Sequence, residues 1–168
     1  TKLWERPYAP GDGYWCFRRP VIIEDTIYAE PMAFDLRTGQ PRMRKHALSG
    51  QDTEWNFRRA YGCGTISACA NAIFYRSGCF GIYDLQADAG TLNWGGMRPG
   101  CWINIIAACG LVLAPEGSAF CTCAYPIQTS IAFNRVERNE NWSVYAATGP
   151  ALPVKRLGLN LGAPGDRR

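Results

Sequence analysis

The sequence predicts an all-β fold, on two observations. No stretch of 12 residues carries apolar side chains at the three- and four-residue spacing of an amphipathic helix. Short runs of β-type residues instead alternate with Gly, Pro, Asn and Asp along the 168 residues, and many short strands in one domain are typical of a sandwich or a propeller. The predicted strands are Tyr14–Phe17, Val21–Ile23, Thr26–Glu30, Met32–Leu36, Thr65–Ala70, Ala72–Arg76, Gly81–Leu85, Trp102–Ile106, Leu111–Ala114, Gln128–Phe133 and Trp142–Ala146.

The composition is that of a globular chain. Hydrophobic residues make up 47% and charged residues 19%, which excludes a disordered or collagen-like chain. No run of about 18 apolar residues is present, so no transmembrane helix is predicted. The 18 basic residues are scattered and the net charge is only +4, so we expect no nucleic-acid partner.

The first residue is Thr1, and we expect either a removed leader or a longer parent chain.

An internal repeat favours a propeller over a sandwich. Three segments share one pattern, in which a turn leads into an apolar strand and a second strand follows after a gap. Their anchors Ile27, Ile73 and Leu111 are 46 and 38 residues apart, and a period near 40 residues with four short strands is typical of a propeller blade. The predicted blades are 14–60, 61–100 and 101–147, followed by a tail over 148–168.

The first repeat shows how such a blade is built. Thr26–Glu30 and Met32–Leu36 are expected to pair as antiparallel neighbours. Asp35 is expected to accept hydrogen bonds from the amides of the following turn, and Gly39 supplies a position with positive φ. A blade buries both faces against its neighbours, so three blades leave two faces open.

The segment Ala33–Gly39 resembles the repeat of the quinoprotein-like (PQQ-like) β-propellers, which reads A-x-D-x-x-T-G-x-x-x-W. The final Trp of that repeat falls on Met43 here, whereas the second repeat restores it at Trp94, after Asp84 and a longer turn. A longer ordered series is similar to large extracytoplasmic propeller proteins of planctomycete-type bacteria. It comprises residues 61–64, 74–78, 83–85, 98–102, 121–125 and 157–168. The resemblance implies a propeller that continues in other blades or chains.

The resemblance does not carry the parts of a PQQ-dependent dehydrogenase. Such enzymes use adjacent cysteines that form a disulfide, whereas Cys121 and Cys123 are separated by one residue. No cluster of acidic residues has the spacing of a calcium loop. His46 is the only histidine, which excludes a Ser-His-Asp or Cys-His arrangement and a His-based zinc site within this chain. We therefore predict a protein without enzymatic activity, cofactor or metal, and keep a dehydrogenase fragment as an alternative.

The eight cysteines favour an oxidising, extracytoplasmic setting. Eight cysteines allow 105 connectivities. The preferred hypothesis pairs Cys63 and Cys101 with Cys121 and Cys123, in either combination, because all four lie in the shared series. A weaker hypothesis joins Cys69 to Cys109, which precede the same strand in two repeats. A four-thiolate zinc site and buried thiols remain alternatives.

Aromatic residues near glycine-rich loops are the candidates for ligand binding. Exposed Trp and Tyr rings stack on sugars, and Arg reaches hydroxyl or uronate groups; the alternative is that these rings fill the spaces between blades. The candidate glycan-binding residues are Trp94, Arg98, Trp102 and Tyr125. The sequence thus predicts a cell-surface or secreted scaffold or binding protein that assembles with itself or with further blades, and acidic polysaccharide binding as the alternative.

Overall fold

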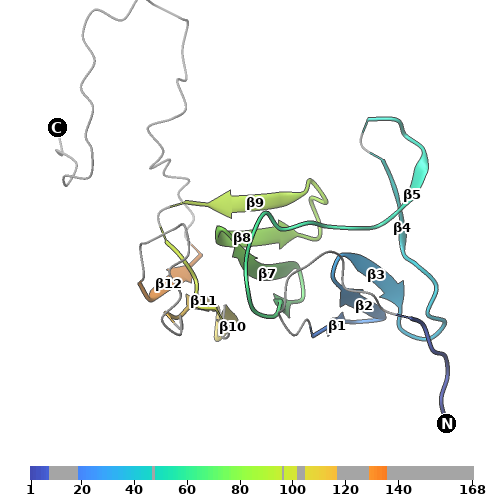
Figure 1. Cartoon of the computed structure of the whole chain (residues 1–168), viewed down its shortest axis with the longest axis horizontal. Helices are drawn as coiled ribbons and strands as arrows, with labels where there is room; N and C mark the ends of the chain where they lie inside the picture. Colours follow the sequence, from blue (N-terminus) through green and yellow to red (C-terminus); the bar gives the residue numbers. More distant parts are fainter. Residues whose placement is uncertain (8–18, 47, 96, 102–104, 117–128, 136–168) are drawn as a thin grey trace, which may run out of the picture. The chain divides into compact units, whose positions relative to one another are not determined.

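The computed structural model describes residues 1–7, 19–46, 48–95, 97–101, 105–116 and 129–135. These residues form strands and no helix, so the predicted all-β class is confirmed (Figure 1). No helix in them is therefore long and apolar enough to cross a membrane. The predicted strands Tyr14–Phe17 and Trp142–Ala146 lie outside the described residues. The strands are β1 Val21–Ile23, β2 Thr26–Ala29, β3 Met32–Asp35, β4 Met43–Lys45, β5 Asp52–Glu54, β6 Ser67–Cys69, β7 Ala72–Ser77, β8 Cys79–Asp84, β9 Thr91–Trp94, β10 Ile106–Ala108, β11 Leu111–Ala114 and β12 Ile131–Asn134.

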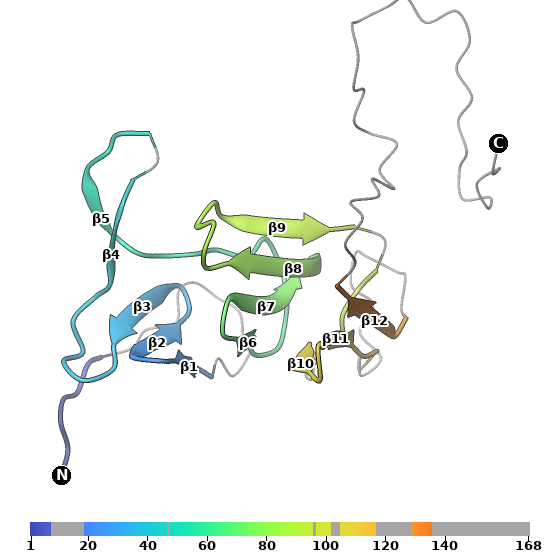
Figure 2. The ribbon, with the colours of Figure 1, turned by 180° about the vertical axis from the view of Figure 1, so that it is seen from behind.

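Three antiparallel sheets are built in the same way, each from strands in chain order. The first sheet is β1-β2-β3, the middle sheet is β6-β7-β8-β9, and the third sheet is β10-β11-β12. The four-stranded middle sheet is seen from both sides in Figures 1 and 2. In each sheet a two-residue turn joins the first two strands, at residues 24–25, 70–71 and 109–110. In the first and third of these turns, Glu24, Cys109 and Gly110 have positive φ, which matches the twist of the flanking strands in a two-residue hairpin turn.

The register of the strands aligns the three repeats. The residue after the turn lies opposite an Asp or Asn in every sheet, in the pairs Thr26–Asp35, Ala72–Asp84 and Leu111–Asn134. Ile27 and Ile73 are therefore equivalent, as predicted. The third anchor was wrong by one residue: Val112, rather than Leu111, matches them, because the turn before it ends at Gly110.

The turn after the third strand is also repeated. Asp35 Oδ1 accepts hydrogen bonds from the amides of Arg37 at 3.0 Å and Thr38 at 2.9 Å. Asp84 Oδ1 makes the equivalent contacts at 2.8 and 3.1 Å with the amides two and three residues further on. These bonds stabilise the turn, because they give acceptors to backbone amides that strand pairing leaves unbonded. They confirm the role predicted for Asp35, and Gly39 has the expected positive φ of 70°.

Successive side chains of a strand point to opposite faces of its sheet. We call the face that bears Tyr28, Phe74 and Leu113 the forward face, and the face that bears Ile27, Ile73 and Val112 the backward face. The two names apply to all three sheets, because the register makes these positions equivalent.

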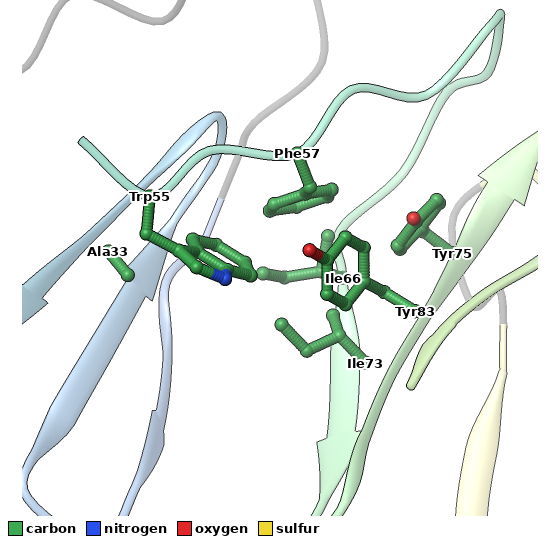
Figure 3. Packing of buried hydrophobic residues seen from close by; sticks show 7 residues of the cluster. All are labelled: Ala33, Trp55, Phe57, Ile66, Ile73, Tyr75 and Tyr83. Atoms are coloured by element: carbon green, nitrogen blue, oxygen red, sulfur yellow. The ribbon is translucent and has the colours of Figure 1, made fainter. Parts of the chain in front are cut away.

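The middle sheet is covered on both faces. Its backward face packs against the forward face of the first sheet, in a cluster that holds Ile73, Tyr75 and Tyr83 together with Ala33 (Figure 3). Tyr28 of the first sheet packs against the same cluster. The forward face of the middle sheet packs against the backward face of the third sheet, in a second cluster around Phe74 and Phe80. All six residues of β7 are buried as a result. The sheets therefore stack in the order first, middle, third.

The first strands of neighbouring sheets also contact one another. β1 contacts β6, and β6 contacts β10. Each of these strands is hydrogen-bonded on one side only, to the next strand of its own sheet. The three unpaired strand edges therefore lie in sequence along the stacked sheets.

A hairpin interrupts the segment that runs along the outer edge of β3. The edge of β3 pairs first with Pro41 and then, beyond the β4-β5 hairpin, with Asn56. The amide of Phe57 donates to the carbonyl of Pro31 at 2.9 Å. Pro31 precedes Asp35 by four residues, as Phe80 precedes Asp84, and Phe80 lies opposite Trp94. The aromatic position that the resemblance assigned to Met43 is therefore occupied by Phe57.

Candidate functional site

A polar cluster around Asp88 joins an acidic, a basic and two aromatic side chains. Asp88 Oδ1 accepts hydrogen bonds from Trp55 Nε1 at 2.9 Å and from the Tyr83 hydroxyl, and it pairs with Arg44 Nη1 at 3.2 Å. The same Arg44 nitrogen donates to the Tyr83 oxygen at 2.8 Å. Arg44 is on β4, Tyr83 is on β8, and Trp55 follows β5. The cluster thus ties the inserted hairpin to the middle sheet.

Asp88 has an unusual backbone for a residue with a side chain. Its φ is 45°, and its amide donates to the carbonyl of Asp84 at 3.0 Å. Gly39 does the same in the first repeat, with a φ of 70° and a bond of 2.9 Å to the carbonyl of Asp35. An aspartate thus stands where the first repeat has glycine, although a side chain there costs roughly 1 kcal/mol or more. The carboxylate at this position makes contacts that a glycine cannot make.

The chemistry of the cluster favours a structural role. Burial, reinforced by the hydrogen bond to Asp88, raises the pKa of Tyr83 well above its usual value, so the phenol remains a neutral donor at physiological pH. Tyr83 is 1% exposed, and the three donors occupy one oxygen of the carboxylate. These contacts hold the inserted hairpin on the middle sheet.

A buried ion pair joins the turn between β2 and β3 to the segment before β6. Arg59 binds Glu30 in a bidentate manner, with Nε–Oε1 at 2.9 Å and Nη2–Oε2 at 2.6 Å, and their side chains are only 5% and 6% exposed. Arg59 also donates to the carbonyl of Gly64 at 3.1 Å. A planar guanidinium matches two carboxylate oxygens at once. This geometry fixes the backbone between the first and middle sheets.

Metal-binding geometry is absent from the residues described. No group of three or more His, Cys, Asp or Glu side chains in them is arranged to hold a metal ion. His46 Nδ1 instead caps the tip of the β4-β5 hairpin, within 3.2 Å of the amide and hydroxyl of Ser49. An open groove of about 540 Å³ runs between residues 21–24 and 68–70, and Glu24 is its only charged lining residue.

Comparison with known proteins gave no match: no family model, no curated protein and no solved structure is similar to this chain. The resemblance to PQQ-like propellers therefore stays a prediction.

The structure separates the candidate glycan-binding residues. Trp94 is 43% exposed at the end of β9 and stacks on Phe80, with ring centroids 5.0 Å apart, beside Phe133 at 5.3 Å. Arg98 is fully buried, so its guanidinium is out of reach of a glycan at the surface. Trp102 and Tyr125 lie outside the described residues. Of the two candidates that the structure describes, only the Trp94 ring is exposed, and it also contributes to the packing between sheets.

The cysteine hypotheses have different outcomes. The thiols of Cys69 and Cys109 are exposed and free, so the predicted bridge between them is not formed. Cys69 is the last residue of β6 whereas Cys109 is the first residue of a turn, so the two positions are not equivalent. The other hypothesis pairs Cys63 and Cys101 with Cys121 and Cys123, and the latter two lie outside the described residues. Cys63 is half-buried, and Cys101 is buried where Arg76 Nη1 donates to its sulfur at 3.2 Å.

The forward face of the third sheet is an apolar surface that no described sheet covers. Its backward side chains pack on the middle sheet, whereas Ile106 and Leu111 on the forward side are 43% and 38% exposed. Ala108 and Ala132 on the same side are exposed as well. An exposed apolar face of this kind indicates an interaction surface.

The backward face of the first sheet is its counterpart at the other end of the stack. Ile22 on this face is 60% exposed. The N-terminal segment covers another part of it: Trp4 Nε1 donates to the carbonyl of Leu36 at 2.9 Å, and the Arg6 guanidinium lies 5.2 Å from the centroid of the Phe34 ring. A Cβ on Gly39 would come within 2.7 Å of the Trp4 ring, so this glycine also makes room for the segment.

Sequence reasoning missed the Asp88 cluster and the Glu30–Arg59 pair. Neither carboxylate was identified from the sequence, because Arg59, Trp55 and Arg44 lie between 29 and 44 residues away in the chain and only Tyr83 is near Asp88, five residues away. One signal was available for Asp88. Counting four residues from Asp35 gives Gly39, and counting four from Asp84 gives Asp88, which reveals an aspartate at a glycine position.

Proposed function

We propose that this chain is a non-catalytic scaffold of the β-propeller type, in which each of the three sheets acts as a blade. The observation that carries the proposal is the repeated packing of forward face on backward face, between the first and middle sheets and again between the middle and third sheets. In a propeller, radially repeated small sheets pack on one another in this manner. The adjacent edge strands β1, β6 and β10 support the same arrangement.

A structural role fits the chemistry of the chain. The clustered charged groups that the structure describes are used to join segments, at Asp88 and at the Glu30–Arg59 pair. We place the protein outside the cytoplasm, as the cysteine content suggests. Non-reducing peptide mapping of Cys121 and Cys123 tests that setting, since alkylatable thiols at both positions in protein isolated from its native source would contradict it.

Hydrogen exchange tests the stacking of the sheets. Ile73→Val removes one methyl group from the backward face of the middle sheet, and Phe74→Leu replaces an aromatic ring on the forward face with a smaller side chain. Each change lowers the free energy of unfolding by an amount on the order of 1 kcal/mol. We expect faster amide exchange in β1–β3 for the first variant and in β10–β12 for the second, measured by mass spectrometry. The two variants control for each other. Equal effects of both variants on one sheet would overturn the proposed stacking.

Acidic polysaccharide binding is the second candidate, and the half-exposed Trp94 favours it. Its indole is held by stacking on Phe80 while part of the ring remains exposed, which keeps an aromatic surface in a fixed orientation for a sugar. Affinity electrophoresis on acidic polysaccharides distinguishes the two functions. Retention of the wild-type chain that is lost in Trp94→Ala supports binding, whereas equal mobility of both proteins on every polysaccharide rules out this site.

A further inference from the structure

The two uncovered faces at the ends of the stack complement each other. The forward face of the third sheet carries Ile106, Leu111 and Leu113, together with the small Ala108 and Ala132. The middle sheet carries Ala72, Phe74 and Ile82 at the positions equivalent to Leu111, Leu113 and Ala132. In the middle sheet these side chains pack in a hydrophobic cluster against the next sheet. The exposed face of the third sheet is therefore built like an internal interface.

The internal interfaces also show which surface covers a forward face. In both of them the covering surface is a backward face, with Ile73 and Ala68 in one case and Val112 and Ala107 in the other. The first sheet has the equivalent pair, Ile27 opposite Ile22 on neighbouring strands. Ile22 is 60% exposed and Ile27 is half-buried. Within the described residues, this is the backward face that no other sheet covers.

We propose that a second copy of this chain covers these faces, with the third sheet of each copy packed on the first sheet of the other. This inference rests on the proposed function. A head-to-tail contact either closes into a ring or continues as a filament. Two copies bring together six sheets, which falls within the four to eight blades of known propellers. Closure at two copies gives a dimer with two identical interfaces, in each of which the third sheet covers the part of the first sheet's backward face, around Ile22, that the N-terminal segment leaves exposed.

Light scattering coupled to size-exclusion chromatography tests the dimer on the full chain. We expect the wild-type protein to have twice the chain mass of 18.6 kDa at micromolar concentrations. Leu111→Glu places a charge on the forward face and Ile22→Glu places one on the backward face. Because burying an unpaired carboxylate is costly, each variant should elute as a monomer. Ile106→Glu repeats the forward-face test at a second, 43% exposed position.

Leu48→Glu is the matched control, since Leu48 is 93% exposed at the tip of the β4-β5 hairpin and on neither face. It should leave the mass at two chains, and far-ultraviolet circular dichroism should show unchanged strand content in all variants. A monomeric wild-type chain overturns the proposal. A dimer that persists in Ile22→Glu and dissociates in Leu111→Glu overturns the head-to-tail arrangement, and a larger assembly overturns closure at two copies.

Failure of the dimer is distinguishable from failure of the proposed function. If the chain is monomeric but the Ile73 and Phe74 variants still change hydrogen exchange on one face each, the sheets are stacked as proposed and only the dimer is wrong. A chain without face-specific exchange loses the propeller-type stacking itself.

Discussion

At the scale of single residues, the most informative position is Asp88. The two equivalent turns differ there: Gly39 has no side chain and lies under the Trp4 ring, whereas Asp88 binds Trp55, Tyr83 and Arg44. In the first repeat, the residue with positive φ leaves room for the Trp4 ring. In the second repeat, the residue with positive φ carries a carboxylate that binds neighbouring side chains. One backbone conformation therefore serves two kinds of contact with two different segments of the chain.

Substitution of Asp88 separates the backbone from the carboxylate. Asp88→Gly makes the turn like that of the first repeat and relieves the positive φ, but it removes the acceptor for three donors. Asp88→Ala removes the acceptor and keeps the strain. We expect the free energy of unfolding to fall by about 2 kcal/mol in Asp88→Gly and by roughly 1 kcal/mol more in Asp88→Ala. Urea denaturation measures both values. An Asp88→Gly protein as stable as the wild type would show that the carboxylate is dispensable.

At the scale of elements, apolar strands bounded by turn residues were predictable from the sequence, whereas polar strands were not. The runs around Ile27, Ile73 and Val112 are apolar and bounded by turn residues, and nine of the observed strands overlap predicted ones. The β4-β5 hairpin was missed because its strands read Met-Arg-Lys and Asp-Thr-Glu, without β-branched alternation. It is held by a partner on another sheet, Tyr83, and such a distant contact leaves no local pattern in the sequence.

The position of each cysteine in a strand or turn determines how readily its thiol is alkylated. Cys69 and Cys109 are exposed, whereas Cys79 is half-buried on β8 and burial raises the pKa of its thiol. Because the thiolate is the reactive form, we expect iodoacetamide to label Cys69 and Cys109 faster than Cys79 in the folded, unreduced protein. Peptide mass spectrometry over time measures the three rates, and urea-unfolded protein is the control. Lack of labelling at both exposed sites would show that they form a bridge in solution.

At the scale of the whole molecule, stability is concentrated where the stacked sheets meet. β7 has neighbours on both faces, and each fully buried apolar or aromatic side chain there contributes roughly 1.5–3 kcal/mol. The repeat in the sequence predicted that blades bury both faces, which holds for the middle sheet. It did not predict which residues lie between the sheets, since that depends on the one-residue shift in the third repeat and on Trp55 and Phe57 beyond the hairpin. Buried tyrosines in this core couple global stability to pH.

Alkaline pH should destabilise the whole fold through these tyrosines. Burial raises the pKa of Tyr75 from 10.0 to about 12, against a smaller lowering effect of its hydrogen bond to Thr91. Between these pH values the unfolded chain loses a proton that the folded chain keeps, so unfolding becomes more favourable as the pH rises. Below pH 10 both states are protonated and this effect vanishes. We expect the urea midpoint to be constant up to about pH 10 and to fall toward pH 12, with a shallower fall in Tyr75→Phe. An equally steep fall in the variant, or phenolate absorbance from Tyr75 in the folded protein near pH 10, would show that this hydroxyl is solvated and uncoupled from the core.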